Sequence, residues 1–480
     1  MDTFVTKTTS YEKANLDEEV AKMVFATNSS FRLVEHPQFC KMVGKLRPGY
    51  TPPTRKEIAD KFLPMIYEKE YAKCATELKD EIVCLSLDGR SNIHNEPIIC
   101  VTVTTSSGHI YLVDTIDTSG QPHTAEYLEE LSKSAIQKCK EELDCHVGSI
   151  VTDNAANVSK MRKLLEQGNE LKLVTYGCTA HILNLLAHDL EIGNIKEHVV
   201  YIVKYFRNNH YASARYRQEG GQRLVMPQDT RWNTMCNCLK IYIKNWPALM
   251  KICEVDREHI DVKVREKVSS LTLKRSAEDL LARLEPIAVA LDKVQSDKCT
   301  IAEAVNIWKE LITTLCNDRD ALTAVKKRFD QVITQAHLLA NLIHPSLQGK
   351  LLSAEEVNNA MDYANEKFPS LVPVIMKFQA KSPPFHAFKF SDSVTKCMSA
   401  VEWWRSHSYV LDNVISAAQQ LLSAVASSSG VERVFSSYGI VHSKLRNRLG
   451  TEKAAKLVFL FKTMNAHKMD VFDDTNDQDV

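Results

Sequence analysis

Three things are scarce in this sequence: long apolar runs, a basic-then-apolar leader, and an excess of charge of either sign. No run approaches the roughly 18–20 uninterrupted apolar residues of a membrane-spanning helix, so we expect no membrane partner. The N-terminus, Met-Asp-Thr-Phe-Val-Thr-Lys, does not resemble a secretion signal. Lys and Arg total 60, and so do Asp and Glu. Because a dedicated DNA-binding domain is usually basic, this neutrality argues against strong DNA affinity by the chain alone.

Regularly spaced cysteines are also absent. The 13 cysteines are scattered and odd in number, which in a chain of 480 residues favours reduced thiols in the cytosol or nucleus. Cys178-Thr-Ala-His181 has C-x-x-H spacing at the start of a predicted helix. A zinc site needs about four ligands, however, and no second pair lies nearby. We therefore interpret Cys178 and His181 as half-buried residues that brace a strand-to-helix turn.

The neutral total conceals two basic segments and an acidic tail, residues 469–480. Residues 204–233 carry six Lys or Arg against two acids, and residues 433–462 carry seven against one. Such segments suit phosphate contacts, although solvated helix faces explain them equally well. An exposed Trp232 could stack on an unpaired base, or it could belong to a helical core. The candidate DNA-binding residues are Arg231, Trp232, Arg433, Lys444, Arg446 and Arg448.

Apolar spacing divides the chain into helical and strand-rich parts. Residues 1–80 have helical spacing, with Thr54 as a predicted N-cap, and form an accessory region. Short β-type runs then occur at 82–88, 97–105, 109–118, 147–153 and 171–176. Segments with helical periodicity lie before the fourth run, between the fourth and fifth runs, and after the fifth run. Three antiparallel strands, a helix, a strand, a helix, a strand and a helix predict an RNase H-like α/β core with a mixed five-stranded sheet.

The remaining chain is predicted to be helical. Residues 81–200 are the first part of the α/β core, and residues 201–400 form a large all-α insertion domain. Residues 401–468 form a C-terminal helical region that completes the core. The segment 380–386, with its Pro-Pro pair, is expected to be a flexible link. Adjacent Trp403 and Trp404 are expected to anchor helices in a core.

Three isolated carboxylates are the candidate catalytic and metal-binding residues. Asp88 and Asp153 each end an apolar strand-like run, and Glu432 lies in an otherwise apolar and basic helical segment. Singly, each Asp could form an Asx turn or a helix cap, and Ser429 to Glu432 has the pattern of a capping box. Together, crowded carboxylates repel unless cations neutralise them. Two Mg²⁺ or Mn²⁺ ions about 3.5–4 Å apart would do so over a phosphodiester.

Several short blocks, taken in order, resemble the hAT superfamily of DNA transposases and the cellular proteins domesticated from them. The blocks are Asp88, Asp153 with Asn154-Ala-Ala-Asn157, Cys178-x-x-His181-x-x-Asn184, Asp229-Thr-Arg231-Trp232, His344-Pro345 to Gly349, and Ser428 to Ser436 with Lys444 to Leu449. The resemblance covers most of the chain. His344 is a departure, because the family usually has an acidic residue there.

The resemblance implies an RNase H-like core that binds two Mg²⁺ or Mn²⁺ ions through Asp88, Asp153 and Glu432 and cuts DNA. It also implies dimerisation through residues 401–468 and a nuclear location. The family's usual BED zinc finger is not found in residues 1–80, which contain only Cys40 and Cys74 as cysteines. DNA binding without a separate finger is therefore expected to be weak.

Two functions are consistent with these features. The first is a metal-dependent transposase that cleaves and transfers DNA strands. The second is a domesticated, catalytically silent nuclear protein that dimerises and acts as a scaffold or transcriptional regulator. Apolar residues near the C-terminus support a homodimer or higher oligomer, unless they pack only against the protein's own core: Leu445, Leu449, Ala454, Leu457, Val458, Leu460 and Phe461.

Overall fold

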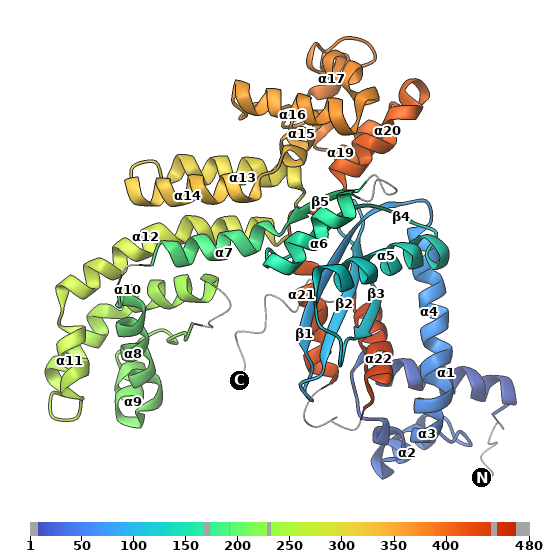
Figure 1. The fold of residues 1–480 in the computed structure, drawn as a ribbon. Coiled ribbons are helices and arrows are strands. Elements are labelled where there is room, and N and C mark those ends of the chain that lie inside the picture. The colour runs from blue at the N-terminus through green and yellow to red at the C-terminus, as the bar shows by residue number, and fades with distance from the viewer. Residues whose placement is uncertain (1–7, 168–172, 192, 228–231, 443–448, 467–480) are drawn as a thin grey trace. The chain divides into compact units, whose positions relative to one another are not determined.

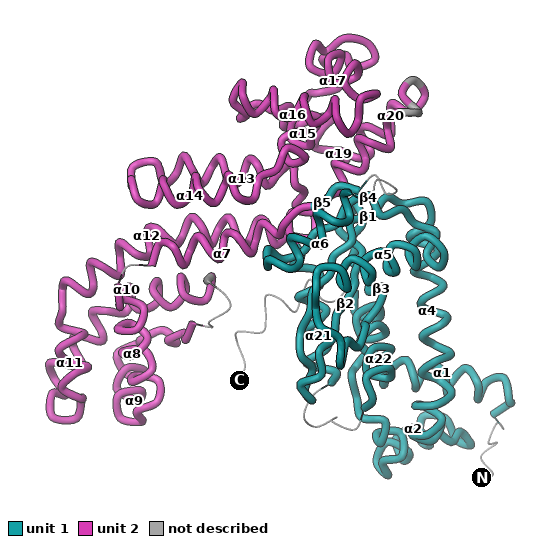
Figure 2. The backbone as a smooth tube through the Cα atoms, viewed as in Figure 1, with its two compact units in different colours: residues 1–175, 428–480 teal, residues 176–427 magenta. Residues whose placement is uncertain are grey.

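A computed structural model describes residues 8–167, 173–191, 193–227, 232–442 and 449–466. The chain divides into two compact units (Figures 1 and 2). Unit 1 comprises residues 1–175 and 428–480, and unit 2 comprises residues 176–427. The C-terminal segment therefore returns to the same compact unit as residues 1–175. All 13 cysteines are free thiols, and no described helix is both long and apolar enough to cross a membrane.

The sheet is mixed and five-stranded, as predicted, with strand order β3-β2-β1-β4-β5. Its strands are β1 (Ile82–Ser91), β2 (Pro97–Thr104), β3 (Ile110–Asp117), β4 (His146–Thr152) and β5 (Val174–Gly177). β1 pairs antiparallel with β2, and β2 pairs antiparallel with β3. β1 pairs in parallel with β4, after the crossover helix that such a connection requires. The sequence pattern located every strand to within about three residues.

Helices precede the sheet, cross over it and return to it from the C-terminus (Figure 1). Those of unit 1 are α1 (Ser10–Ala26), α2 (Pro37–Leu46), α3 (Arg55–Glu57), α4 (Leu63–Leu78), α5 (Ala125–Glu142), α6 (Ala156–Gln167), α21 (Ser429–Val441) and α22 (Thr451–Met464). Short η1 (Phe31–Glu35) and η2 (Ile58–Phe62) adjoin α2 and α4. Thr54 is the predicted N-cap: it exchanges hydrogen bonds with Glu57 in a capping box.

The two faces of the sheet carry different cores, because side chains alternate along each strand. Val83, Leu85 and Leu87 of β1 belong to a buried cluster with side chains of α5 and α6. Ile98 and Cys100 of β2 belong to a second cluster with α21, α22, α1 and α4. The helices from the end of the chain thus cover one sheet face, and the crossover helices cover the other.

Unit 2 is helical, and its described residues 201–227 and 232–400 contain no strand beyond an isolated bridge at Thr300. Its helices are α7 (Thr179–Asp189), α8 (Ile195–Asn208), α9 (His210–Gln218), α10 (Trp232–Val255), α11 (Val262–Val268), α12 (Leu271–Val294), α13 (Ile301–Thr314), α14 (Arg319–Val332), α15 (Gln335–Ile343), α16 (Ala354–Lys367), α17 (Val372–Gln379), α18 (Asp392–Thr395), α19 (Ala400–Arg405) and α20 (Ser408–Leu422), with short η3 (Pro369–Leu371) and η4 (Ala387–Phe390).

The segment 380–386, expected to be a flexible link, is mostly exposed but is anchored in unit 2 at Phe385. Phe385 is fully buried and stacks on Trp403, with ring centroids 5.8 Å apart. Trp403 and Trp404 are buried, as predicted, and each indole N–H donates to a backbone carbonyl. An aromatic side chain following the two prolines supplies enough buried area to fix the segment.

The C-terminal apolar residues pack largely within their own chain. Ala454, Leu457, Val458 and Leu460 are buried in the core that α22 forms with the sheet and the N-terminal helices. The partly buried residues Leu449 and Phe461 pack against the same core, and Leu445 lies outside the described residues. These side chains therefore do not by themselves argue for a dimer, and the alternative of internal packing holds for them.

Candidate functional site

Asp88 and Asp153 occupy equivalent positions on neighbouring parallel strands. The register of β1 and β4 runs up to the pair Ser86 and Val151. Asp88 is two residues beyond Ser86, and Asp153 is two residues beyond Val151, so extending the register places the two aspartates opposite each other. Adjacent strands are about 4.8 Å apart, which brings two such carboxylates within interaction range.

The sequence pattern predicts that Asp88 ends its strand, and this prediction was wrong. β1 continues to Ser91, because Gly89 to Ser91 pair with Pro97 to Ile99 of β2. Asp88 itself pairs with Cys100 and shares its sheet face, the one that α21 and α22 cover. Asp153 is the first residue after β4, as predicted.

Glu432 reaches this face from the far end of the chain. It lies on α21, which packs against β1 and β2. Gly430 permits the close approach, since a Cβ there would lie 2.9 Å from Cδ1 of Ile110 on β3. The helix begins at Ser429 with Ser428 as N-cap, so Glu432 is its fourth residue. A capping box needs its Glu at the third position, and the capping alternative is therefore not supported.

The three carboxylates interact electrostatically. The pKa of Asp88 is raised from 3.8 to about 6, first because its half-buried carboxyl is desolvated. The negative charges of Glu432 and then Asp153 raise this pKa further, while the backbone N–H of Gly89 and the charge of Arg90 oppose the rise. Glu432 and Asp153, far from Asp88 in sequence, are thus close enough to raise the pKa of Asp88.

Local hydrogen bonds fix the two aspartates. The N–H of Gly89 donates to Oδ1 of Asp88 at 2.8 Å, and the N–H of Ala155 donates to Oδ1 of Asp153 at 3.2 Å. The second bond is the Asx turn that was the alternative interpretation of Asp153. Arg162 of α6 donates to the Asp153 carbonyl at 2.6 Å. A turn role and a site role are compatible, because each carboxylate has a second oxygen.

Carboxylate oxygens are the ligands that Mg²⁺ and Mn²⁺ prefer, so the chemistry of these residues fits a divalent cation. Within the described ranges, however, no three His, Cys, Asp or Glu side chains are close enough together to hold one ion as they stand. Asp88, Asp153 and Glu432 would have to approach one another further to share a cation.

The other predicted site residues are dispersed. Cys178 is buried and is the N-cap residue of α7, and His181 is half-buried on that helix. The turn at Cys178 is anchored by Thr179, whose N–H donates to the Ala426 carbonyl at 3.0 Å. No metal-binding group of three residues is found in the described part of the chain, Cys178 and His181 included. Both residues lie at the strand-to-helix turn, Cys178 more deeply buried than predicted, and the bracing role stays a prediction.

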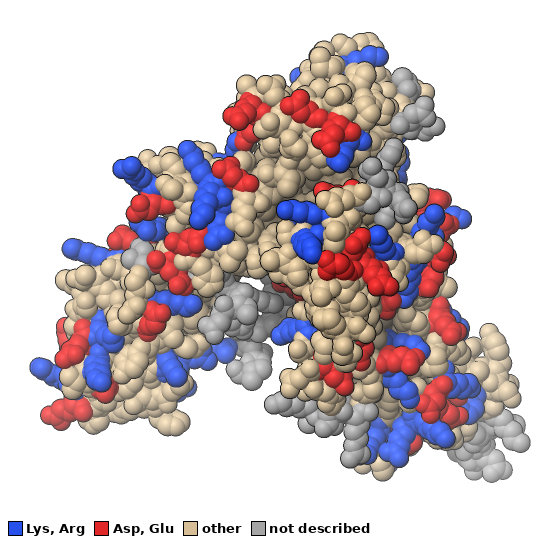
Figure 3. All heavy atoms as spheres, in the orientation of Figure 1, with Lys and Arg blue, Asp and Glu red and all other residues tan. Residues whose placement is uncertain are grey.

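The predicted DNA-binding residues are only partly described. Arg433 is half-buried on α21, next to Glu432. Trp232 begins α10. Arg231, Lys444, Arg446 and Arg448 lie outside the described residues. On the face that Figure 3 shows, basic and acidic side chains are intermixed over both units, in keeping with the neutral composition.

One residue near the site was missed by the sequence analysis. Lys462 of α22 has a buried Nζ without a hydrogen-bond partner among the described residues. Burial lowers its pKa to about 7, the charge of Arg433 lowers it further, and Cys100 opposes the shift. The signal was present in the sequence, because Lys462 follows the buried Ala454 and Val458 at four-residue spacing, on the inner stripe of the helix.

Comparison with known proteins matches two regions of the chain to families. Residues 53–205 match a domain of unknown function (DUF659), and residues 385–464 match the hAT family C-terminal dimerisation region. The second match supports a homo-oligomer. A protein of Talaromyces stipitatus named "Putative transcriptional regulator tpeD" is 20% identical over 507 aligned positions, covering 88% of this chain. This chain spans 58% of that relative's length. Together, the two family matches indicate a hAT-family transposase-like protein.

Proposed function

We propose that this protein cleaves and transfers DNA strands with divalent cations, using an RNase H-like core. The observation that carries the proposal is the electrostatic coupling of Asp88 to Asp153 and Glu432. Three carboxylates from separate parts of the chain destabilise one another unless positive charge is supplied. Strongly perturbed pKa values cluster at functional sites, where charged groups are brought together.

The three acids have separate tasks in this proposal. Asp88 within β1 and Asp153 directly after β4 would hold the cations, and Glu432 would complete the set from α21. Bound Mg²⁺ or Mn²⁺ activates a water or 3′-hydroxyl and stabilises the leaving oxygen. Asp88, with a pKa of about 6, is more than half ionised at pH 7, and its charge attracts the cation. DNA in the nucleus is the proposed substrate, and a homodimer is the proposed working form.

The direct test is nicking of supercoiled plasmid with Mn²⁺. Wild type is expected to nick, EDTA is expected to abolish nicking, and Glu432→Gln is expected to lower the rate more than about 100-fold, since it removes a charged ligand. Glu452→Gln is the matched control, because Glu452 is also a helical Glu of the C-terminal segment but lies on α22 and pairs with Lys456. Equal nicking by wild type and Glu432→Gln would refute the proposal.

A regulatory role without catalysis is the second candidate. The observation that favours it is the alignment of 88% of the chain with a relative named as a transcriptional regulator. This function predicts binding to chromatin or nuclear factors that Glu432→Gln leaves unchanged. Nicking and pull-down from nuclear extract together separate the two: a regulator keeps its partners in both proteins while the wild type does not nick, whereas an enzyme nicks and loses nicking with Glu432→Gln.

The oligomeric state can be tested with point variants. Deleting residues 401–470 would remove α21 and α22, whose side chains form the core of unit 1, so loss of a dimer would be uninterpretable. Phe388 and Tyr409 are 67% and 72% exposed and lie in the matched dimerisation region. We expect Phe388→Ser/Tyr409→Ser to convert a dimer into a monomer by light scattering, because exposed aromatics anchor interfaces.

Met376→Ser is the control for this experiment. Met376 is 57% exposed in the same unit but lies outside the matched region. It should leave the mass unchanged. A wild type that is monomeric at micromolar concentration, or a double variant that stays dimeric, would contradict this assignment of the interface.

A further inference from the structure

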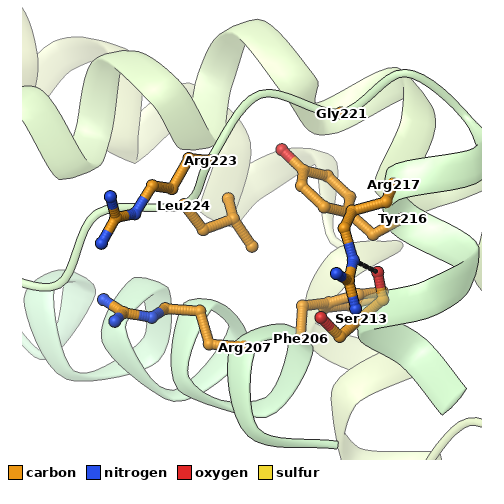
Figure 4. A pocket seen from close by; sticks show the side chains of 8 residues that line it. All are labelled: Phe206, Arg207, Ser213, Tyr216, Arg217, Gly221, Arg223 and Leu224. Carbon is orange, nitrogen blue, oxygen red and sulfur yellow. Dashed lines mark hydrogen bonds between the residues drawn. The ribbon is translucent and has the colours of Figure 1, made fainter. Parts of the chain in front are cut away.

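Unit 2 contains a pocket lined by three arginines, which we call the arginine pocket: Arg207, Arg217 and Arg223 (Figure 4). Arg207 lies on α8, Arg217 on α9, and Arg223 in the loop that follows α9. The side chains of Arg207 and Arg223 end on the same side of the pocket, and Arg217 lies across from them (Figure 4). The cavity volume is about 500 Å³.

The loop that lines the pocket after α9 is fixed by packing and hydrogen bonds. Gly220 has φ +73°, a left-handed conformation that suits glycine. Gly221 packs directly against the Tyr216 ring, where any Cβ would clash. The Tyr216 hydroxyl donates to the Gln222 carbonyl at 2.7 Å, and the Gln222 N–H donates to Asn245 Oδ1 at 3.1 Å. The loop that carries Arg223 is thus tied to α9 and α10.

The pocket arginines differ from a neighbouring arginine in their ion pairing. Arg215, on the same helix as Arg217, pairs with Asp256 at 2.7 Å. Neither Arg207 nor Arg217 has a carboxylate partner within the ranges that the structure describes. All three pocket arginines are exposed. Arg207 and Arg223 end on one side of the pocket, where their guanidinium groups can donate to one anion, whereas Arg217 lies across from them and its Nε–H donates to the Ser213 carbonyl at 3.3 Å.

The rest of the lining is apolar. Phe206, Tyr216 and Leu224 are buried and form part of the pocket wall. A cavity in the range of about 300–1,000 Å³ accommodates a small organic molecule, which is more than an isolated phosphate needs. A guanidinium-rich side beside an apolar wall matches a ligand with one phosphate and one flat ring. An acidic peptide would leave the apolar wall without a partner.

We propose that the arginine pocket binds the phosphate of a nucleotide, presented either free or within an unpaired nucleic-acid strand. The site is separate from the three carboxylates, and its ligand binding does not depend on cleavage. Guanidinium groups would form bidentate hydrogen bonds with phosphate oxygens, and the base would lie against the apolar wall.

Fluorescence anisotropy with a short labelled oligothymidylate in EDTA tests this inference. The full chain with Asp88→Asn is used, so binding is measured without cleavage. Adding Arg207→Glu/Arg217→Glu is expected to weaken binding at least about 10-fold and to reduce the slope of log K against log salt by about 0.7, the value for one lost phosphate contact on a single strand. Arg207→Gln/Arg217→Gln should also weaken binding, and it serves if the Glu variant fails to fold.

The control is Lys204→Glu/Arg257→Glu, which changes net charge equally at exposed positions outside the pocket lining. It should change affinity less than about 3-fold. Competition by thymidine monophosphate would identify a free nucleotide as a ligand, and its absence would assign the pocket to a strand. Equal losses in both charge-reversed variants, no loss in either, or tighter binding of an Asp-rich peptide than of the oligonucleotide would overturn the proposal.

Discussion

Replacing Asp88 with asparagine is expected to stabilise the metal-free protein at pH 7.5 and to lower Mn²⁺-dependent DNA cleavage more than about 100-fold. These two effects have opposite signs and one cause. Burial and the charges of Glu432 and Asp153 raise the pKa of Asp88 from 3.8 to about 6. Asparagine removes the charge that causes the repulsion and, with it, a carboxylate that a cation requires.

The sign of the pH dependence follows from proton linkage. Between pH 3.8 and about 6 the folded protein holds a proton on Asp88 that the unfolded chain releases. Stability is therefore lost as the pH rises through this window, and the cost is complete above pH 6. A shift of this size corresponds to at most about 3 kcal/mol at pH 7.5. At pH 3.5 the two proteins should unfold alike.

Thermal unfolding in EDTA measures the stability of the metal-free proteins, and thermal unfolding in Mn²⁺ measures how far the cation stabilises each of them. Mn²⁺ at 100 times its dissociation constant should stabilise the wild type by about 2.7 kcal/mol and leave Asp88→Asn unaffected. Asp117→Asn is the control, because Asp117 is exposed at the end of β3 on the same sheet. An Asp88→Asn protein that is less stable than wild type at pH 7.5, or that still cleaves, would contradict the carboxylate cluster.

The sheet was predictable because its signals are local. Each strand is a short run of apolar, β-branched residues bounded by polar breaks, and the helix between the third and fourth strands forces a parallel return. The extent of β1 was not predictable: Gly89, Arg90 and Ser91 have weak strand propensity and extend because β2 pairs with them. Tertiary pairing outweighed propensity there.

The three acidic residues were only partly predictable from the sequence. Asp88 and Asp153 each follow a run of buried strand residues, which the sequence pattern shows, but an Asx turn gives the same pattern. Whether Glu432 caps its helix depends on the residue at which α21 begins. A shift of that start by one residue would place Glu432 at the capping position, and the sequence does not determine helix starts that closely. The arginine pocket could not be predicted, because Arg223 reaches the cavity beside Arg207 and Arg217 through a loop whose path depends on Gly221 and Asn245.

Replacing Lys462 with methionine is expected to raise the free energy of unfolding at pH 6 by a few kcal/mol. The Nζ of Lys462 is buried without a hydrogen-bond partner in the described part of the chain. Burial and Arg433 lower its pKa from 10.5 to about 7. Below pH 7 the folded protein must keep an ammonium group in the core, whereas methionine fills similar space without charge.

The pH dependence distinguishes this effect from simple packing. Between about pH 7 and 10.5 the unfolded chain binds a proton that the folded protein has released, so wild-type stability from this group rises with pH. The advantage of Lys462→Met should be largest at pH 6 and shrink towards pH 10. Lys456→Met, which removes an ion-paired lysine of the same helix, should show no such trend. A pH-independent difference, or destabilisation at pH 6, would mean that Lys462 has an anionic partner in the folded protein.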